Sequence, residues 1–265
     1  MVEKRSISKH KKRSGRTLFA ALITVFVVAG AVALYFIITT QRGYSAAQDE
    51  YAGLRQYSPF VSDLAYTGDG SNEESDELTT PVREPVSRPD LSEINPDYVG
   101  WIWVETTTVD YPVVQTTNNT KYLDTTFSGE RNRSGAIFMD SRSVDGFDGL
   151  AILYGHNMRD GSMFAGLDRF IGLDLRDNNY EIIIYVPEDY MLVYRIFGAK
   201  NTSAYDEVFQ LLDMPQESDE DRLAFQAAIE AYFTGFDIPS DADILVLSTC
   251  TEGNRNNRTV VFGIR

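Results

Sequence analysis

Cys250 and His156 are the two residues of this 265-residue chain best suited to act together in nucleophilic chemistry. A free thiol has a pKa near about 8.5, so a cysteine nucleophile usually needs a histidine that takes its proton and later protonates the leaving group. Cys250 is the only cysteine, and the other histidine, His10, lies in a basic tail. A lone cysteine is otherwise a small buried apolar residue, so the pairing is a hypothesis.

The local sequence around both residues favours the catalytic interpretation. The run LAILYGHNM places His156 directly after an expected strand at 150–155, and Cys250 ends another at 244–250. Catalytic groups are often found in loops at the mouth of a rigid sheet. A structural zinc site is disfavoured, because it needs about four Cys or His ligands and the chain after its basic tail offers two.

Two arginines follow the cysteine and could stabilise an oxyanion or hold a substrate carbonyl, since a guanidinium is always charged and carries several donors. Arg258 stands at the start of the expected last strand, 259–264, where its backbone would be fixed. Arg255 lies in the turn EGNRNN, and we expect it to be a solvated surface residue. Rigidity therefore favours Arg258, with Arg255 as the alternative.

Eight short runs rich in β-branched and aromatic residues, bounded by Gly, Asn, Asp and Pro, predict the strands that position these groups. One helix is expected at 218–235, because Ser218 can cap it, its first turn is acidic and Gly235 can end it. Eight strands in about 160 residues suit either a closed barrel or a sandwich. The strands are expected at 101–105, 110–115, 136–139, 150–155, 180–186, 190–200, 244–250 and 259–264, with a hairpin turn at 187–189.

Residues 17–40, TLFAALITVFVVAGAVALYFIITT, contain no charged residue and predict a transmembrane helix. About 20 apolar residues are enough to span the hydrocarbon core of a bilayer. Seven Lys or Arg precede the run within residues 1–16, so the positive-inside rule keeps that tail in the cytoplasm and the rest of the chain outside. A cleaved signal peptide is the alternative, but its apolar region is typically only about 7–15 residues long. A buried core helix fits poorly, because the run is apolar on every side.

The net charge of −15 is unevenly distributed: the basic tail carries +6, so the residues after it carry −21. Such an acidic domain repels nucleic-acid phosphates, which argues against a nucleic-acid partner. Residues 41–66 have Tyr and Leu at near-helical spacing and predict a juxtamembrane helix, and 67–90 is an acidic linker with three prolines. The expected layout is a cytoplasmic tail at 1–16, an anchor at 17–40, a helix and linker at 41–90 and the main domain at 91–265.

Several motifs resemble those of one enzyme family. LSTC followed by an arginine that opens RTVVFG resembles the C-terminal signature of sortases. LYGHNMRDGSMFAGL, residues 153–167, resembles the histidine segment of the class B branch, and residues 94–143 are similar to the N-terminal half of that branch in order and spacing. The resemblance covers about residues 91–265.

This resemblance implies a membrane-anchored cysteine transpeptidase of the kind found mainly in Gram-positive bacteria. Sortases cleave a C-terminal sorting signal of a secreted protein, form a thioacyl-enzyme and pass the acyl group to an amine of a cell-wall precursor or a pilin. The implied fold is mainly β: a closed eight-stranded barrel with N-terminal helices and one helix inserted before the cysteine strand. No metal or organic cofactor is implied, and the catalytic domain is expected outside the cell membrane.

The resemblance also implies a role for each residue that matches its motifs. Cys250 is the expected nucleophile, His156 the general acid and base, and Arg258 the stabiliser of the substrate carbonyl or the oxyanion. The expected substrate-groove residues are Asn119, Leu123, Ser203, Ser248 and Thr249.

Two other functions compete with this interpretation. A non-catalytic surface-binding domain on the same barrel would need none of Cys250, His156 and Arg258. A papain-like hydrolase would carry its cysteine early in the chain and its histidine later, whereas here the histidine comes first. Both are therefore disfavoured relative to a transpeptidase.

Overall fold

The computed structural model describes residues 11–60, 91–175, 178–187, 190–203, 205–214, 218–233, 236–250 and 257–265. It divides the chain into two compact units, residues 1–46 and residues 47–265. The expected linker at 67–90, the helix end at Gly235 and the candidate Arg255 lie outside the described residues.

The first unit consists of most of one long helix, α1 (Lys11–Leu54). It covers the predicted apolar run at 17–40, and it is the one helix of the described residues that is long and apolar enough to cross a membrane. The hydroxyls of Thr24 and Thr39 donate to carbonyls four residues earlier, at Ala20 and Tyr35. These bonds satisfy the polar side chains within an otherwise apolar segment.

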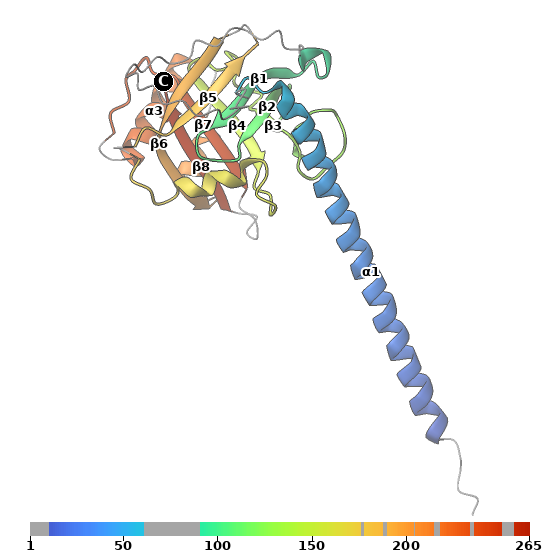
Figure 1. Ribbon diagram of the computed structural model, residues 1–265. Helices are drawn as coiled ribbons and strands as arrows, with labels where there is room; N and C mark the ends of the chain where they lie inside the picture. The colour runs from blue at the N-terminus through green and yellow to red at the C-terminus, as the bar shows by residue number, and fades with distance from the viewer. Residues whose placement is uncertain are drawn as a thin grey trace, which may run out of the picture. The chain divides into compact units, whose positions relative to one another are not determined.

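The second unit is a closed barrel in which the described residues form eight strands in the order β1-β2-β3-β4-β7-β8-β6-β5 (Figure 1). The predicted barrel is therefore confirmed, and the sandwich alternative was wrong. Each predicted strand is present within a few residues of its expected bounds. The strands are β1 (Tyr98–Val104), β2 (Asp110–Gln115), β3 (Ile137–Met139), β4 (Leu150–His156), β5 (Glu181–Val186), β6 (Tyr190–Ser203), β7 (Ile244–Cys250) and β8 (Asn257–Ile264).

Two pairs of neighbouring strands run parallel, β2 with β3 and β4 with β7, and the other pairs are antiparallel. A parallel pair requires a crossover connection rather than a hairpin. The crossover from β4 to β7 includes β5, β6, a short helix α2 (Glu207–Leu211) and the helix α3 (Asp219–Tyr232). The inserted helix was predicted, whereas α2 was not.

The helix α3 begins where its capping residue predicts. The Ser218 hydroxyl accepts a hydrogen bond from the backbone nitrogen of Asp221 at 3.2 Å, which satisfies one free amide of the first turn. Phe225 and Ile229 are fully buried and join a core with alternate residues of β4, β7 and β8. α3 therefore covers the outer face of these strands (Figure 1).

The residues between these positions on the same strands point into the barrel, because successive side chains of a strand alternate between its two faces. They are also apolar and fully buried, so the central strands have a hydrophobic side chain on both faces. The interior residues of β4, β7 and β8 are Ala151, Leu153, Leu245, Leu247 and Val261.

The end of α1 also belongs to the second unit, which begins at Ala47. Tyr51 and Leu54 are buried, and the Tyr51 hydroxyl donates to the carbonyl of Gly135 at 2.6 Å. Ser58, just beyond the helix, donates its hydroxyl proton to Asp110 of β2 at 2.8 Å. The compact unit therefore includes chain that precedes the expected domain start at residue 91.

One buried charge holds several segments of the barrel together. The Asp140 side chain has no exposed area, and it accepts hydrogen bonds from the Arg142 guanidinium and, at 2.9 Å, from the Tyr154 hydroxyl. Arg142 also donates to the carbonyls of Leu212 and Met214, just after α2. Burial alone would raise the pKa of Asp140, but the Arg142 hydrogen bonds outweigh it and hold this pKa below its usual range.

We predict that Asp140→Asn lowers the free energy of unfolding at pH 7 by about 2–3 kcal/mol, because the substitution leaves Arg142 without its carboxylate. A lowered carboxyl pKa stabilises the fold above the unfolded-state pKa, about 3.9, and this contribution is lost as the pH falls through the folded-state pKa. Urea unfolding from pH 7 to pH 3 should therefore show the two proteins converging below about pH 4.

Asp145→Asn is the matched control for this measurement, since Asp145 is an exposed acid of the same loop. It should change stability by no more than about 0.5 kcal/mol. If both variants lose the same free energy of unfolding, the buried Asp140 carboxylate has no special role in holding these segments together.

Candidate active site

The three expected catalytic residues lie on three adjacent strands at one level of the sheet. In the β4–β7 pair His156 is opposite Cys250, and in the β7–β8 pair Cys250 is opposite Arg258. Residues directly opposite each other share a face of the sheet, with Cβ atoms about 4.5–5.5 Å apart. The barrel therefore brings the three positions together from widely separated parts of the chain.

This row of three positions continues the face that α3 covers. Ile152, Val246 and Phe262 are opposite one another in the row under α3. The next row of the same face holds Tyr154, Ser248 and Val260, and the row after that is His156, Cys250 and Arg258. Side chains on one face recur every second residue, so the face changes from apolar to polar over about 13 Å along the strands.

Gly155 allows β4 to pack closely against Ile137 and Phe164 just before His156. A Cβ atom at this position would lie 2.6 Å from Ile137 and 2.8 Å from the ring of Phe164. Phe164 begins the 3-10 helix η4 (Phe164–Phe170) and is fully buried. A side chain at residue 155 would push β4 away from this helix and displace His156.

The His156 ring is oriented by a backbone carbonyl. Its Nε2 atom lies 2.7 Å from the carbonyl oxygen of Leu123. A carbonyl oxygen can only accept a hydrogen bond, so Nε2 carries the proton and donates it. The other ring nitrogen, Nδ1, is therefore the atom that can exchange a proton when the imidazole is neutral.

Asp168 of η4 connects the segments that follow two of the expected catalytic positions. One carboxylate oxygen accepts from the Asn157 amide at 3.0 Å, and the other accepts from the Thr259 hydroxyl. Asn157 directly follows His156, and Thr259 directly follows Arg258. No sequence pattern predicted this role, because η4 reaches both strands only in the folded barrel.

Arg258 lies in β8 between Cys250 of β7 and Thr202 of β6. Its side chain is half-buried, and Nη1 donates to the carbonyl of Asn257 at 3.1 Å. The position in a strand agrees with the fixed backbone expected from the sequence. Residues 251–256, which include Arg255, and the Cys250 side chain lie outside the described part of the chain, so the choice between the two arginines stays a prediction.

The structure separates the two expected groove residues that precede the cysteine. Ser248 lies on the face that carries Cys250, two residues away along β7. Thr249 lies on the opposite face, opposite Gly155 and the fully buried Thr259. Both residues are only 2% exposed. Their contact with substrate stays a prediction.

The other three expected groove residues lie in loops or at a strand end. Leu123 is 43% exposed and supplies the carbonyl that binds His156. Asn119 accepts from the backbone nitrogen of Ser141 at 2.8 Å, so its side-chain oxygen already has a partner. Ser203 ends β6, and its hydroxyl accepts from the backbone nitrogen of Tyr205. That these three residues bind substrate stays a prediction.

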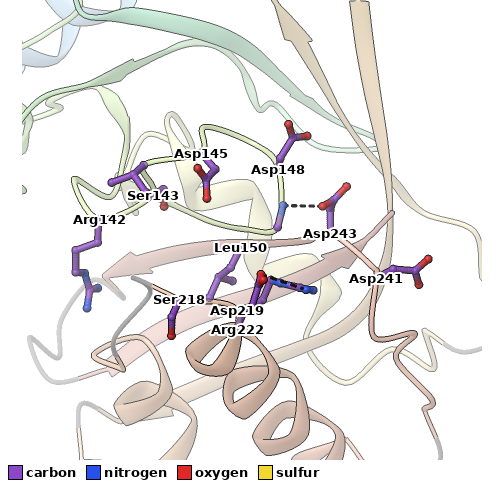
Figure 2. A pocket seen from close by; sticks show the side chains of 12 residues that line it. Arg142, Ser143, Asp145, Asp148, Leu150, Ser218, Asp219, Arg222, Asp241 and Asp243 are labelled. Atoms are coloured by element: carbon purple, nitrogen blue, oxygen red, sulfur yellow. Dashed lines mark hydrogen bonds and ion pairs between the residues drawn. The ribbon is translucent and has the colours of Figure 1, made fainter.

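A pocket of about 670 Å³ lies at the other ends of β4 and β7 (Figure 2). Leu150 lines it, about 20 Å along β4 from His156. Asp243 accepts from the backbone nitrogen of Gly149, and Asp219 pairs with Arg222 (Figure 2). The described residues that line this pocket include no Cys or His, and no described group of three acids, Cys or His is arranged to hold a metal ion. The pocket is therefore distinct from the row that holds His156 and Cys250.

Comparison with protein families gives a match over most of the barrel. Residues 102–265 match the sortase domain model. Sortase B of Listeria monocytogenes is 32% identical over 174 residues, which cover 61% of this chain and 65% of that protein. Sortase B of Staphylococcus aureus is 31% identical over 169 residues, or 61% of this chain and 66% of that protein. The chain thus spans just under two thirds of these relatives.

Solved structures of sortase B share the fold. The Clostridium perfringens enzyme has a TM-score of 0.58 and 32% identity, covering 66% of this chain and 96% of that chain. A Staphylococcus aureus sortase B–substrate complex has a TM-score of 0.56 and 28% identity, covering 66% of this chain and 82% of that chain. The family model, the sequence relatives and the barrel agree, and the chain therefore belongs to the sortase family, with sortase B proteins among its relatives.

Proposed function

We propose that this chain is a membrane-anchored cysteine transpeptidase of the sortase B type. The observation that carries the proposal is the single row formed by His156, Cys250 and Arg258 on β4, β7 and β8. Membership of the sortase family supports the same reaction. A binding domain would need no such row.

In the proposed reaction the Cys250 sulfur attacks the carbonyl carbon of the scissile peptide bond after passing its proton to His156. The carbon–nitrogen bond breaks, and His156 gives the proton to the leaving amine. A second amine then attacks the thioester, His156 takes its proton and returns it to sulfur as the carbon–sulfur bond breaks. Arg258 faces the oxygen on which negative charge develops in both steps.

The substrates are proposed to be secreted proteins with a C-terminal sorting signal, and the acceptor an amine of a cell-wall precursor or a pilin. One similar structure is a Staphylococcus aureus sortase B–substrate complex, which supports substrate binding by this fold. The apolar part of α1 and the basic residues before it support a single membrane anchor with the barrel outside the cell.

Cys250→Ala should abolish both cleavage of a sorting-signal peptide and formation of a thioacyl-enzyme, because no other thiol is present in the chain. The full-length protein in detergent is incubated with a peptide library and candidate amines, and products and covalent adducts are read by mass spectrometry. Circular dichroism controls for folding. Undiminished turnover by the alanine variant would exclude the proposed nucleophile.

Arg258→Ala should lower kcat/KM by about two orders of magnitude, the usual cost of losing an oxyanion donor. Arg258→Lys should recover only part of the loss, because lysine keeps the charge and loses the planar fork. Arg255→Ala is the matched control, and if Arg255 is the solvated surface charge expected from the sequence, its loss should cost no more than about 1 kcal/mol. If Arg255→Ala lowers kcat/KM by about two orders of magnitude and Arg258→Ala leaves it near normal, the oxyanion donor is Arg255 and not Arg258.

Protease added to intact cells should remove the barrel and spare the basic tail, since seven Lys or Arg precede the apolar run. A tag at the N-terminus and a tag at the C-terminus, detected separately by immunoblot, provide the measurement and its internal control. Access of the protease to the N-terminal tag in intact cells would reverse the proposed topology.

A further inference from the structure

The carbonyl that orients His156 belongs to a short 3-10 turn, η3 (Lys121–Leu123). Side chains on two sides hold this turn. Tyr122 is buried, and its hydroxyl donates to Asp97 and accepts from the Asn95 amide, each at 2.8 Å. The Asn118 side chain accepts from the backbone nitrogen of Lys121 at 3.0 Å. The turn is therefore anchored before the chain reaches Leu123.

Gly135 packs closely against this turn. A Cβ atom at Gly135 would lie 2.3 Å from the carbonyl oxygen of Tyr122 and 3.0 Å from that of Leu123. Gly135 also has a φ of +57°, a conformation that favours glycine. The chain at Gly135 thus passes close to the carbonyl group that binds His156 and leaves no room for a side chain, and the next residue, Ala136, donates its backbone nitrogen to the carbonyl of Tyr122 at 3.1 Å.

Tyr51, on α1, fixes the position of Gly135. Its hydroxyl donates to the Gly135 carbonyl at 2.6 Å and accepts from the backbone nitrogen of Phe127 at 3.3 Å. The side chain is 4% exposed, and its ring packs edge-on against Tyr111 with the centroids 5.3 Å apart. Burial raises the pKa of Tyr51 well above its usual range, so the hydroxyl keeps its proton and remains a donor at neutral pH.

We propose that Tyr51 is a positioning residue for His156. Its hydroxyl fixes the position of Gly135 through a hydrogen bond, and the close approach of Gly135 to the turn fixes the Leu123 carbonyl. That carbonyl then accepts the proton on Nε2 of His156 and keeps it there. Nδ1 is then the nitrogen that exchanges a proton with Cys250. The consequence for turnover rests on the proposed transpeptidase function, but the orientation of the ring does not.

The hydroxyl of Tyr51 can be removed with little other change by Tyr51→Phe. Histidine-selective 15N labelling of the full chain in detergent micelles reports which ring nitrogen is protonated, and a His10→Gln variant identifies the signals of His156. The wild-type protein should show neutral His156 protonated on Nε2. Tyr51→Phe should show a mixture of both tautomers and a kcat lower by about three- to tenfold, with KM changed less than about twofold.

Tyr194→Phe is the matched control. Tyr194 has no exposed area, and its hydroxyl donates to the carbonyl of Phe147 at 2.8 Å, so the two variants lose the same kind of buried hydrogen bond. Both should lower the melting temperature by about 2–4 °C. Only Tyr51→Phe should alter the His156 signals and kcat, which separates positioning from a general loss of stability.

A second pair of variants perturbs the carbonyl directly. Gly135→Ala should shift the His156 signals and lower kcat more than Tyr51→Phe does, because its Cβ would collide with the turn. Gly146→Ala is its control. Gly146 has a similar φ, +66°, but no atom lies within 4 Å of an added Cβ, so this variant should leave both readouts unchanged. If Gly135→Ala fails to fold, the comparison of Tyr51→Phe with Tyr194→Phe still tests the proposal.

The proposal is overturned if His156 of the Tyr51→Phe variant keeps the wild-type Nε2 pattern, or if Tyr194→Phe changes the pattern equally. Failure of the proposed function would look different. In that case Cys250→Ala would retain turnover or the wild-type protein would show none, while the 15N signals would still report whether Tyr51 orients the ring.

Discussion

Because β4 and β7 run parallel and in register, the ends that carry His156 and Cys250 reach the same edge of the barrel. A slip of one residue would move one of them to the opposite face, since side chains alternate along a strand. Ile152 and Val246 oppose such a slip, because both must stay in the apolar row that α3 covers. The packing of α3 thus specifies the pairing of two polar residues that it need not touch.

The histidine is held by three interactions of different physical kinds. Close approach at Gly155 positions its backbone, the Leu123 carbonyl orients its ring, and Asp168 connects the residue after it to β8. Each acts before substrate arrives, so little ring freedom has to be lost during the reaction. Such preorganisation suits the proposed reaction, in which one imidazole takes a proton from two nucleophiles and gives a proton to two leaving groups in turn.

The strands could be predicted from the sequence because their apolar runs are local, and Ser218 marked the start of α3 for the same reason. His156, Cys250 and Arg258 were singled out by residue type and by their places at strand ends, and the motif resemblance then implied a role for each. The sequence could not predict the Leu123 carbonyl or Asp168, since a backbone acceptor has no residue signature and η4 meets β8 only through the closed fold. The extension of the compact unit back to Ala47 depends equally on distant contacts, such as that of Tyr51 with Gly135.

The pairing of β4 with β7 also has a consequence for folding kinetics. His156 and Cys250 are separated by about ninety residues, and contacts between such distant segments form late and slowly, because the entropy of closing the intervening loop must be lost first. In the proposed reaction His156 takes the proton of Cys250, so until the two strands pair the thiol keeps the weak nucleophilicity of an ordinary cysteine. Under the proposed function, an incompletely folded chain therefore has an ordinary thiol, and a reactive one requires the closed barrel.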